Sequence, residues 1–188
     1  MSSWNLGCVI LCLIFIDLQN DYFPGGRKEL DASLKALQNI QLILNHCRKR
    51  GYEIIFIKHI ALKSNAPFFI EGTEGSEIHR SIKPAEKDHL IIKHYPNAFR
   101  ETDLHELLTK SRITNLVFTG MMTHMCVDTT VRAAFDLGYN NILISDCCAT
   151  VDLVYNDETV KAGDVQNAFL AALKGTFCSI TATEEFIK

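Results

Sequence analysis

Short, almost wholly apolar runs alternate along this chain with longer segments in which apolar residues recur every three or four positions. The first run, residues 8–16, contains no charged side chain, which is typical of a strand buried on both faces. Residues 30–50 then show helical spacing and stop at Gly51, a residue type common at helix ends. The same criteria predict strands at 52–59, 89–93, 115–119, 141–145 and 177–181, and helices at 102–111, 123–137 and 157–173.

This alternation predicts an α/β fold, namely a doubly wound, mainly parallel sheet of six strands with helices on both faces, and hence three layers. The length suits a single domain over residues 1–188. Thr102 is the expected N-cap of the helix at 102–111. The connection at 61–87 has no regular periodicity, and its stretch 64–71 is expected to form a lid or a subunit contact.

Charge and cysteine content narrow the class of function. A formal net charge of −3, with scattered cations, leaves no basic surface for nucleic acid or anionic membranes. The run at 8–16 is about half of the ~20 residues that span a bilayer, so we expect neither a membrane anchor nor a signal peptide. Seven cysteines, an odd number without a C-x-x-C pair, indicate packed thiols in a reducing cytoplasm rather than a disulfide scaffold.

Cys126 is the first candidate for chemistry. It follows the fourth apolar run, which breaks at Gly120, and lies in the first turn of the next predicted helix. Unpaired backbone N–H groups and the positive end of the helix dipole there favour the thiolate, which is the nucleophilic form. The same N–H groups could stabilise a developing oxyanion. The alternative is a buried cysteine that only packs.

Asp17 and Lys93 directly follow the first and third predicted strands. The carboxyl ends of parallel strands meet at one edge of the sheet, so both side chains are expected near Cys126. A carboxylate at the end of an apolar strand is costly to desolvate without a partner, although Asp17 could instead cap a turn. Lys93 could be an ordinary solvated lysine, or it could hold the charges of the carboxylate and the thiolate together. An acid, a cation and a thiol gathered there indicate a cysteine hydrolase.

Several ordered motifs resemble those of the isochorismatase-like cysteine hydrolases, which include nicotinamidases, N-carbamoylsarcosine amidohydrolases and ureidoacrylate amidohydrolases. The resemblance extends over almost the whole chain, and several motifs in one order are more specific than any single one. The segments that carry it are DLQNDYF at 17–23, GTEGSEI at 72–78, Lys93 with NAF at 97–99, GMMTHMCVDTT at 120–130, and Asp146 with AT at 149–150.

The resemblance implies a catalytic triad of Asp17, Lys93 and Cys126. Asp17 would take the thiol proton and return it to the leaving amine, Lys93 would stabilise this arrangement, and Cys126 would form a thioester that water hydrolyses. The resemblance also implies a cis peptide bond between Met121 and Met122, with the N–H groups of Met122 and Cys126 forming the oxyanion hole. The expected reaction is hydrolysis of an amide, ureido or carbamoyl C–N bond in a small molecule, without a cofactor.

The pocket is expected to draw on Phe23, Tyr95, Phe99 and His124, although each of these side chains could merely pack. The resemblance further suggests a homo-oligomer, because members of the family commonly assemble.

A metal site is not expected. The nicotinamidase branch binds a metal through an Asp-x-His pair after the second strand, with another histidine nearby. Here that strand ends in Lys58-His59-Ile60, without such a pair. His59 and His79 are too few and too far apart in sequence to indicate a site, and each is interpreted as an ordinary polar histidine.

Three other functions remain open. Cys126 and Arg132 fit the C-x5-R phosphate loop of cysteine phosphatases, but the intervening residues lack glycine and include Asp128, so Arg132 is expected to form an ion pair on a helix. Relatives that hydrolyse the vinyl ether of isochorismate can lack the cysteine, and its presence favours C–N hydrolysis. The third possibility is a binding module that retains an idle triad.

Overall fold

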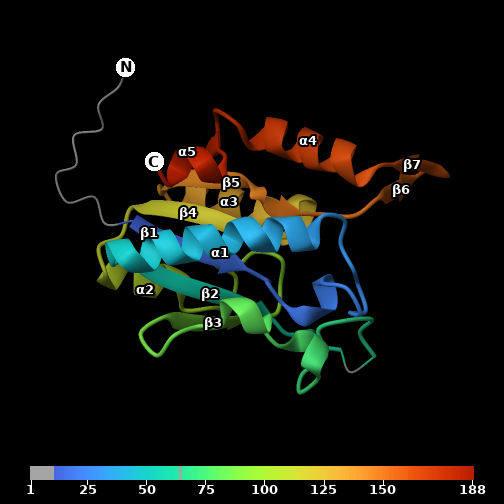
Figure 1. The fold of residues 1–188 in the computed structure, drawn as a ribbon, viewed down its shortest axis with the longest axis horizontal. Coiled ribbons are helices and arrows are strands. Elements are labelled where there is room, and N and C mark those ends of the chain that lie inside the picture. The colour runs from blue at the N-terminus through green and yellow to red at the C-terminus, as the bar shows by residue number, and fades with distance from the viewer. Residues whose placement is uncertain (1–10, 64) are drawn as a thin grey trace.

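A computed structural model describes residues 11–63 and 65–188 (Figure 1). Its centre is a parallel sheet of six strands in the order β3-β2-β1-β4-β5-β8, as the alternating pattern predicts. The strands are β1 (Leu11–Ile16), β2 (Glu53–His59), β3 (His89–Lys93), β4 (Asn115–Met121), β5 (Asn140–Ala149) and β8 (Ser179–Thr181). The predicted start of the first strand, residues 8–10, lies outside the described residues.

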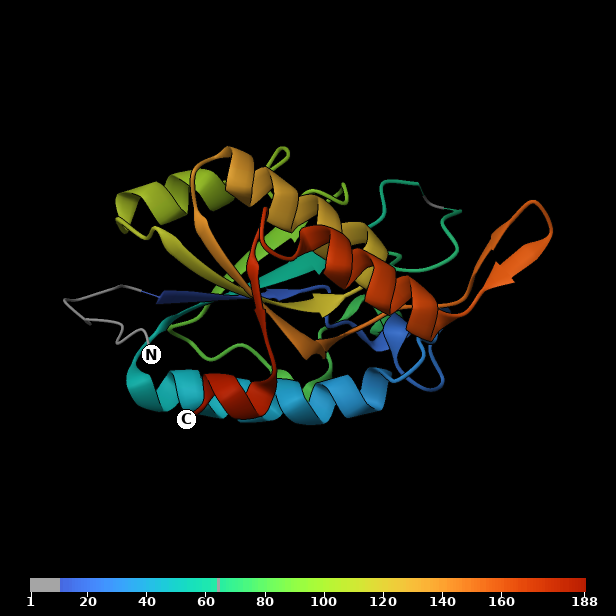
Figure 2. The same cartoon turned by 90° about the horizontal axis from the view of Figure 1, so that it is seen from above.

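Helices cover both faces of the sheet, which confirms the predicted three layers (Figure 2). One face carries α1 and α5, and the other carries α2, α3 and α4. The helices are α1 (Ser33–Arg50), α2 (Leu104–Lys110), α3 (Asp128–Asp136), α4 (Ala162–Leu173) and α5 (Thr183–Phe186). Within the described residues, none of them combines the length and the apolar character that a membrane crossing requires.

The strand order reverses between β1 and β4, and this places the candidate residues together. The chain builds β1, β2 and β3 outward in one direction and then crosses to β4 on the other side of β1. In such sheets a crevice forms outside the carboxyl ends of the two strands at the reversal. Asp17 follows β1 and Cys126 lies in the turn after β4, so both lie at this crevice.

The apolar run of β1 is explained by two cores, one on each side of the sheet. Leu13 and Phe15 belong to the core that includes α1, whereas Cys12, Ile14 and Ile16 belong to the core that includes α2 and α3. Because alternate side chains point to opposite faces, a strand with a core on each face needs apolar residues at every position. Burial of each such side chain contributes about 1.5–3 kcal/mol.

Two predicted helix starts are wrong. α2 begins after Asp103, which occupies the N-cap position without a side-chain cap bond, whereas Thr102, the predicted cap, lies one residue earlier, donates to the Ala98 carbonyl at 2.6 Å and accepts from the Leu104 N–H at 3.4 Å. Residues 157–161 are not helical, because the chain there forms a hairpin of β6 (Leu153–Tyr155) and β7 (Glu158–Val160) that projects from the body (Figure 2). Its two turn residues, Asn156 and Asp157, have positive φ, as a tight hairpin turn requires.

Other boundaries shift for local reasons. The predicted helix at 123–137 begins as a π-helical turn, η4 (Thr123–Val127), before α3. β5 continues to Ala149, because its last residues pair with Gly120 and Met121 of β4 beyond a bulge. Gly51 ends α1 in the left-handed conformation, as predicted. The long connection after β2 contains the short helices η2 (Glu74–Ser76) and η3 (Arg80–Ile82).

Gly120 allows β4 to approach β1 beside the crevice. Its φ is +136°, and a Cβ at this position would collide with the carbonyl of Ile16. Both the backbone conformation and the close approach therefore require glycine.

We predict that Gly120→Ala lowers the free energy of unfolding by about 1–3 kcal/mol, because the new Cβ strains the backbone between two central strands. Urea denaturation measures the change. Gly163→Ala in α4 is the matched control, since a Cβ there meets nothing within 4 Å and alanine favours a helix. Equal stability of the two variants would contradict the close approach.

Candidate active site

Asp17 ends β1 in an unusual backbone conformation. Its φ is +52°, while its N–H still donates to the Ile57 carbonyl at 3.0 Å. The left-handed region is rare for residues other than glycine but is tolerated by aspartate, and it often occurs at functional sites. The side chain is fully buried. The chain thus turns sharply at Asp17 and buries its carboxylate at the carboxyl end of β1.

Lys93, the last residue of β3, is fully buried, and its ammonium faces three acceptors. Nζ lies 2.8 Å from Asp17 Oδ2, 3.2 Å from Cys126 Sγ and 2.9 Å from His59 Nδ1. An ammonium has three N–H donors, so each donor has one acceptor. We call these four residues, Asp17, His59, Lys93 and Cys126, the Lys93 cluster.

Cys126 lies in the η4 turn with only 5% of its surface exposed. A carboxylate oxygen of Asp17 lies within 4.8 Å of its Sγ. Asp17 Oδ1 is buried and has no hydrogen-bond partner among the described residues. One oxygen of this carboxylate is therefore held by Lys93, while the other is free to accept a proton.

Burial opposes the preference for the thiolate that the position of Cys126 in the turn predicts. Burial raises the pKa of this thiol far above its usual value, and the Asp17 carboxylate raises it further, whereas Lys93 opposes the shift. The short π-helical turn does not outweigh this desolvation. Cys126 is therefore a thiol at rest, with its potential base beside it.

Lys93 stays ionised in spite of its burial. Desolvation alone would lower its pKa, but Asp17 and Cys126 more than offset this, and the pKa stands above the usual value. The cluster therefore holds an ammonium against both Asp17 Oδ2 and Cys126 Sγ.

The interpretation of His59 as an ordinary polar histidine is wrong, because the structure brings it into the Lys93 cluster. His59 ends β2 and is in direct register with Lys93 of β3. Its position could have been inferred from the sequence by the argument that placed Asp17 and Lys93, since it too is the last residue of a predicted strand. His79, by contrast, caps η3 by accepting from the Ser81 N–H.

The motif at residues 17–23 organises the surrounding loops. The buried Gln19 side chain accepts from the His59 N–H at 2.7 Å and donates to the His59 carbonyl at 2.8 Å. Asp21 accepts from the Phe69 N–H at 2.7 Å and from the Arg27 N–H at 3.2 Å. Gln19 thus satisfies the backbone of the last residue of β2, and Asp21 satisfies N–H groups of two loops.

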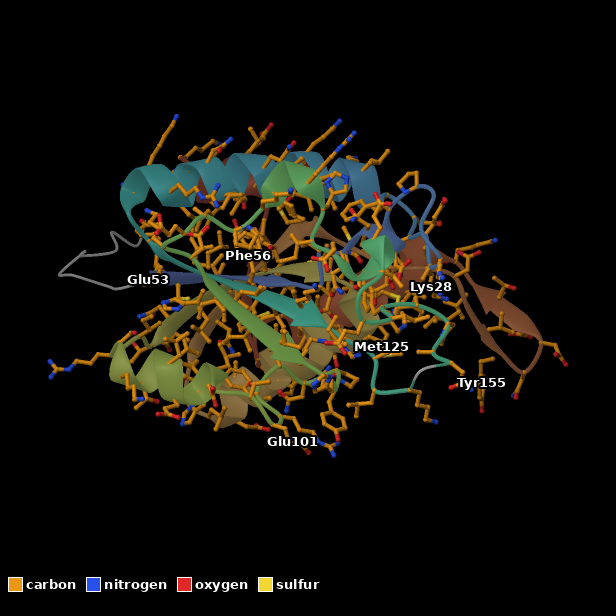
Figure 3. All side chains as sticks on the ribbon, turned by 90° about the horizontal axis from the view of Figure 1, so that it is seen from below. Lys28, Glu53, Phe56, Glu101, Met125 and Tyr155 are labelled. Carbon is orange, nitrogen blue, oxygen red and sulfur yellow. The ribbon has the colours of Figure 1, made fainter. Side chains whose placement is uncertain are left out.

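An aromatic wall adjoins the cluster. The Tyr22 and Phe69 rings pack edge to face at 4.6 Å, and Phe69 lies 5.8 Å from the His59 ring. Burial, and then the neighbouring Cys126 and Asp17, raise the pKa of Tyr22, so its phenol stays protonated. Met125, next to Cys126, is 42% exposed at the edge where the strands end (Figure 3). The sequence patterns gave no reason to select it.

The turn after β4 has the features expected for oxyanion binding. The peptide bond between Met121 and Met122 is cis. The N–H groups of Met125 and Val127, on either side of Cys126, donate to the Met122 carbonyl. The Met122 N–H makes no hydrogen bond among the described residues. The roles of the Met122 and Cys126 N–H groups in catalysis remain predictions.

The four residues expected in the pocket make packing contacts of their own. The Phe23 ring lies 4.6 Å from His79, and the guanidinium of Arg100 lies 3.6 Å over the Tyr95 ring. The remaining two contacts are Phe99 stacked on Tyr139 and His124 Nδ1 hydrogen-bonded to Thr150 Oγ1. Their part in substrate binding stays a prediction.

Comparison with known proteins agrees with this geometry. The family model for the isochorismatase domain matches residues 11–185. The chain belongs to the isochorismatase family. It is therefore an isochorismatase-family hydrolase.

Relatives match this hydrolase over nearly its whole length. YddQ of Bacillus subtilis strain 168, an uncharacterized isochorismatase family protein, is 44% identical over 94% of this chain and 98% of its own. A crystal structure from Oleispira antarctica, provisionally named an isochorismatase hydrolase, has a TM-score of 0.92 and 36% identity over 100% of this chain and 98% of its own. Nicotinamidase 3 of Arabidopsis thaliana is 28% identical over 85% of this chain and 81% of its own.

A divalent metal ion does not fit among the residues of the Lys93 cluster. Asp17, His59 and Cys126 each place one possible ligand atom within 4.8 Å of the others, a donor set that zinc can use. However, the ammonium of Lys93 already contacts all three residues, through Asp17 Oδ2, His59 Nδ1 and Cys126 Sγ. A divalent cation there would meet a buried positive charge, so we derive no step through a metal.

The Arg132 side chain is held by contacts other than those of a phosphate loop. Its Nε lies 3.0 Å from both carboxylate oxygens of Asp128, one turn earlier in α3, and its guanidinium lies over the Phe177 ring. The predicted ion pair is confirmed.

We predict that Lys93→Met lowers the free energy of unfolding by about 3–5 kcal/mol, because the buried Asp17 carboxylate loses its counter-charge. The double variant Asp17→Asn, Lys93→Met should lose less than the sum of the single changes, since the charges are removed together. Urea denaturation of the four proteins measures this. Lys110→Met, which breaks an exposed pair with Glu106, is the control and should change little. If the two changes in the free energy of unfolding simply added, the contact between Asp17 and Lys93 would be contradicted.

Proposed function

We propose that this protein is a cysteine hydrolase that cleaves an amide, ureido or carbamoyl C–N bond in a small molecule through a thioester. The observation that carries the proposal is the contact of one buried ammonium with both a carboxylate and a thiol, at 2.8 and 3.2 Å. A nucleophile, a base and an orienting charge within reach of one another are the requirements of covalent acyl transfer.

The first half of the reaction forms the thioester. Asp17 Oδ1 takes the proton from Sγ of Cys126 as the sulfur attacks the carbonyl carbon. The oxyanion that develops accepts from the N–H groups of Met122 and Cys126. When the C–N bond breaks, Asp17 returns the proton to the leaving nitrogen, which departs as ammonia or an amine.

The second half releases the acid product. Asp17 removes a proton from a water molecule that attacks the thioester carbonyl, and the Cys126 thiolate leaves and takes a proton from the same carboxyl group. Lys93 remains protonated throughout, because it holds one oxygen of Asp17 and stabilises the negative charge as it moves between the carboxylate and the sulfur.

Several observations favour this reaction over the alternatives. Nicotinamidase 3, a relative of this chain, is named for action on an amide. A vinyl ether hydrolase has no need of the thiol placed beside Lys93. The guanidinium of Arg132 forms an ion pair with Asp128 and is not left for a phosphate, which argues against the phosphatase hypothesis. An idle binding module gives no reason for the unpartnered oxygen of Asp17.

A screen of nicotinamide, N-carbamoyl amino acids and ureido acids, with released ammonia as the readout, tests the reaction class. We expect turnover of at least one class and complete loss of it in Cys126→Ala, because no other described thiol lies beside a base. Cys47→Ala, which changes a buried cysteine of α1, is the matched control and should retain turnover. Ammonia release that persists in Cys126→Ala would overturn the mechanism.

Asp17→Asn should reduce kcat by about 10²–10⁴-fold, since an amide cannot accept the thiol proton. Circular dichroism should show a folded protein. Iodoacetamide labelling of the unmodified protein, followed by mass spectrometry, should modify Cys126 faster than Cys47. If Cys126 of the unmodified sequence reacts no faster than Cys47, the nucleophile is misassigned.

A further inference from the structure

The third N–H of Lys93 points to a role for His59. Two of the three donors of this ammonium serve Asp17 and Cys126, and the third meets His59 Nδ1 at 2.9 Å. The ammonium is fully buried, so water does not replace a missing acceptor without a rearrangement. A buried charged donor without a partner is costly.

We propose that His59 is a positioning residue, which accepts this third hydrogen bond as a neutral imidazole and thereby holds the Lys93 ammonium against Asp17 and Cys126. The inference rests on the proposed function, since it concerns the activation of Cys126. It assigns a role to a side chain that lies outside the triad implied by the family resemblance.

The backbone of His59 is built to keep the ring in place. The Gln19 amide accepts from the His59 N–H and donates to the His59 carbonyl, and its second donor reaches the Ser76 carbonyl at 2.8 Å. Gln19 itself is fully buried. Such a fully paired amide has one arrangement, which fixes the position of His59 relative to Asp17, two residues before Gln19.

The ring has contacts that set its direction as well. Phe69 lies 5.8 Å from the imidazole, and the Phe69 backbone is in turn held by Asp21. Pairing of β2 with β3 puts His59 directly opposite Lys93. The hydrogen bonds from Gln19, the register of β2 with β3 and the neighbouring Phe69 ring together direct His59 Nδ1 toward the ammonium.

The charges around His59 keep it neutral. Burial, and then Lys93, lower its pKa to about 4, with Asp17 opposing and His94 adding to the effect. Cys126, the other titratable group of the cluster, is a thiol at rest. Above about pH 5 the imidazole is therefore unprotonated, and because Nδ1 accepts from Lys93, the ring proton is on Nε2.

A neutral acceptor suits this position better than a carboxylate. A second acid beside Lys93 would share its charge with Asp17 and leave less of it for the sulfur. A neutral nitrogen fixes the direction of the ammonium without competing for its charge. Asparagine offers an acceptor near the position of Nδ1, whereas alanine offers none.

Rates of Cys126 alkylation by iodoacetamide across a pH series test the proposal without a known substrate. We expect His59→Ala to slow the reaction by about 10- to 100-fold, the effect of a lost hydrogen bond to a charged group, and to move its pH midpoint upward. His59→Asn should recover most of the rate and return the midpoint. His79→Asn is the control, since His79 contacts Ser81 and Phe23 instead, and it should match the unmodified protein.

The outcomes separate the two proposals. If Cys126 is unreactive before any substitution, the proposed function fails. If Cys126 is reactive but His59→Ala behaves like His79→Asn, the role of His59 is overturned while the hydrolase proposal stands. Equal loss in His59→Ala and His59→Asn, with unchanged thermal unfolding, would overturn the acceptor role.

Discussion

The buried ammonium of Lys93 is the interaction on which the site depends. A cation in the interior is tolerated only when its charge is balanced and each of its donors is paired, and here a carboxylate, an imidazole and a thiol meet that condition. The three acceptors come from the end of β1, the end of β2 and the turn after β4. The sheet order β3-β2-β1-β4 brings these segments to a lysine at the end of β3.

The same ammonium also acts on the pKa of Cys126, the nucleophile that we propose. Burial and Asp17 favour the thiol, and Lys93 limits but does not reverse that preference. In the mechanism that we propose, activation therefore occurs at the moment of attack, when the proton moves from sulfur to a carboxylate oxygen that has no other partner among the described residues. The base that the proposed mechanism needs is already in place beside this thiol, because a carboxylate oxygen of Asp17 lies within 4.8 Å of Sγ.

The fold could be predicted from the sequence because strand burial has a strong compositional signal. The unbroken apolar run before Asp17 reflects a core on each side of β1, and β3 was predicted without error from a run of five residues. Helix starts were predicted less well, because local hydrogen bonds decide them. Thr102 has the right chemistry for a cap but donates to Ala98, and a tight turn at 156–157 converts an expected first helical turn into a hairpin.

The site could be predicted as far as strand ends and a family resemblance allow. These brought Asp17, Lys93 and Cys126 to one edge, where the structure places them in contact. The contact of His59 with Lys93 could not be predicted from the metal-binding pattern of the family, because the partner of His59 is a lysine and not a metal. The pocket could not be predicted from the sequence, since the directions of Tyr95 and Phe99 depend on side-chain contacts with Arg100 and Tyr139, which no sequence pattern specifies.

The most direct test of this account is the ionisation of Lys93, followed by ¹⁵N NMR of lysine-labelled protein and assigned by comparison with Lys93→Met. The account predicts one lysine whose Nζ resonance remains that of a hydrogen-bonded ammonium beyond the ordinary lysine pKa of 10.5, because Asp17 and Cys126 hold its proton. A Lys93 that titrates at or below that value would contradict the claim that a triply paired ammonium organises the site.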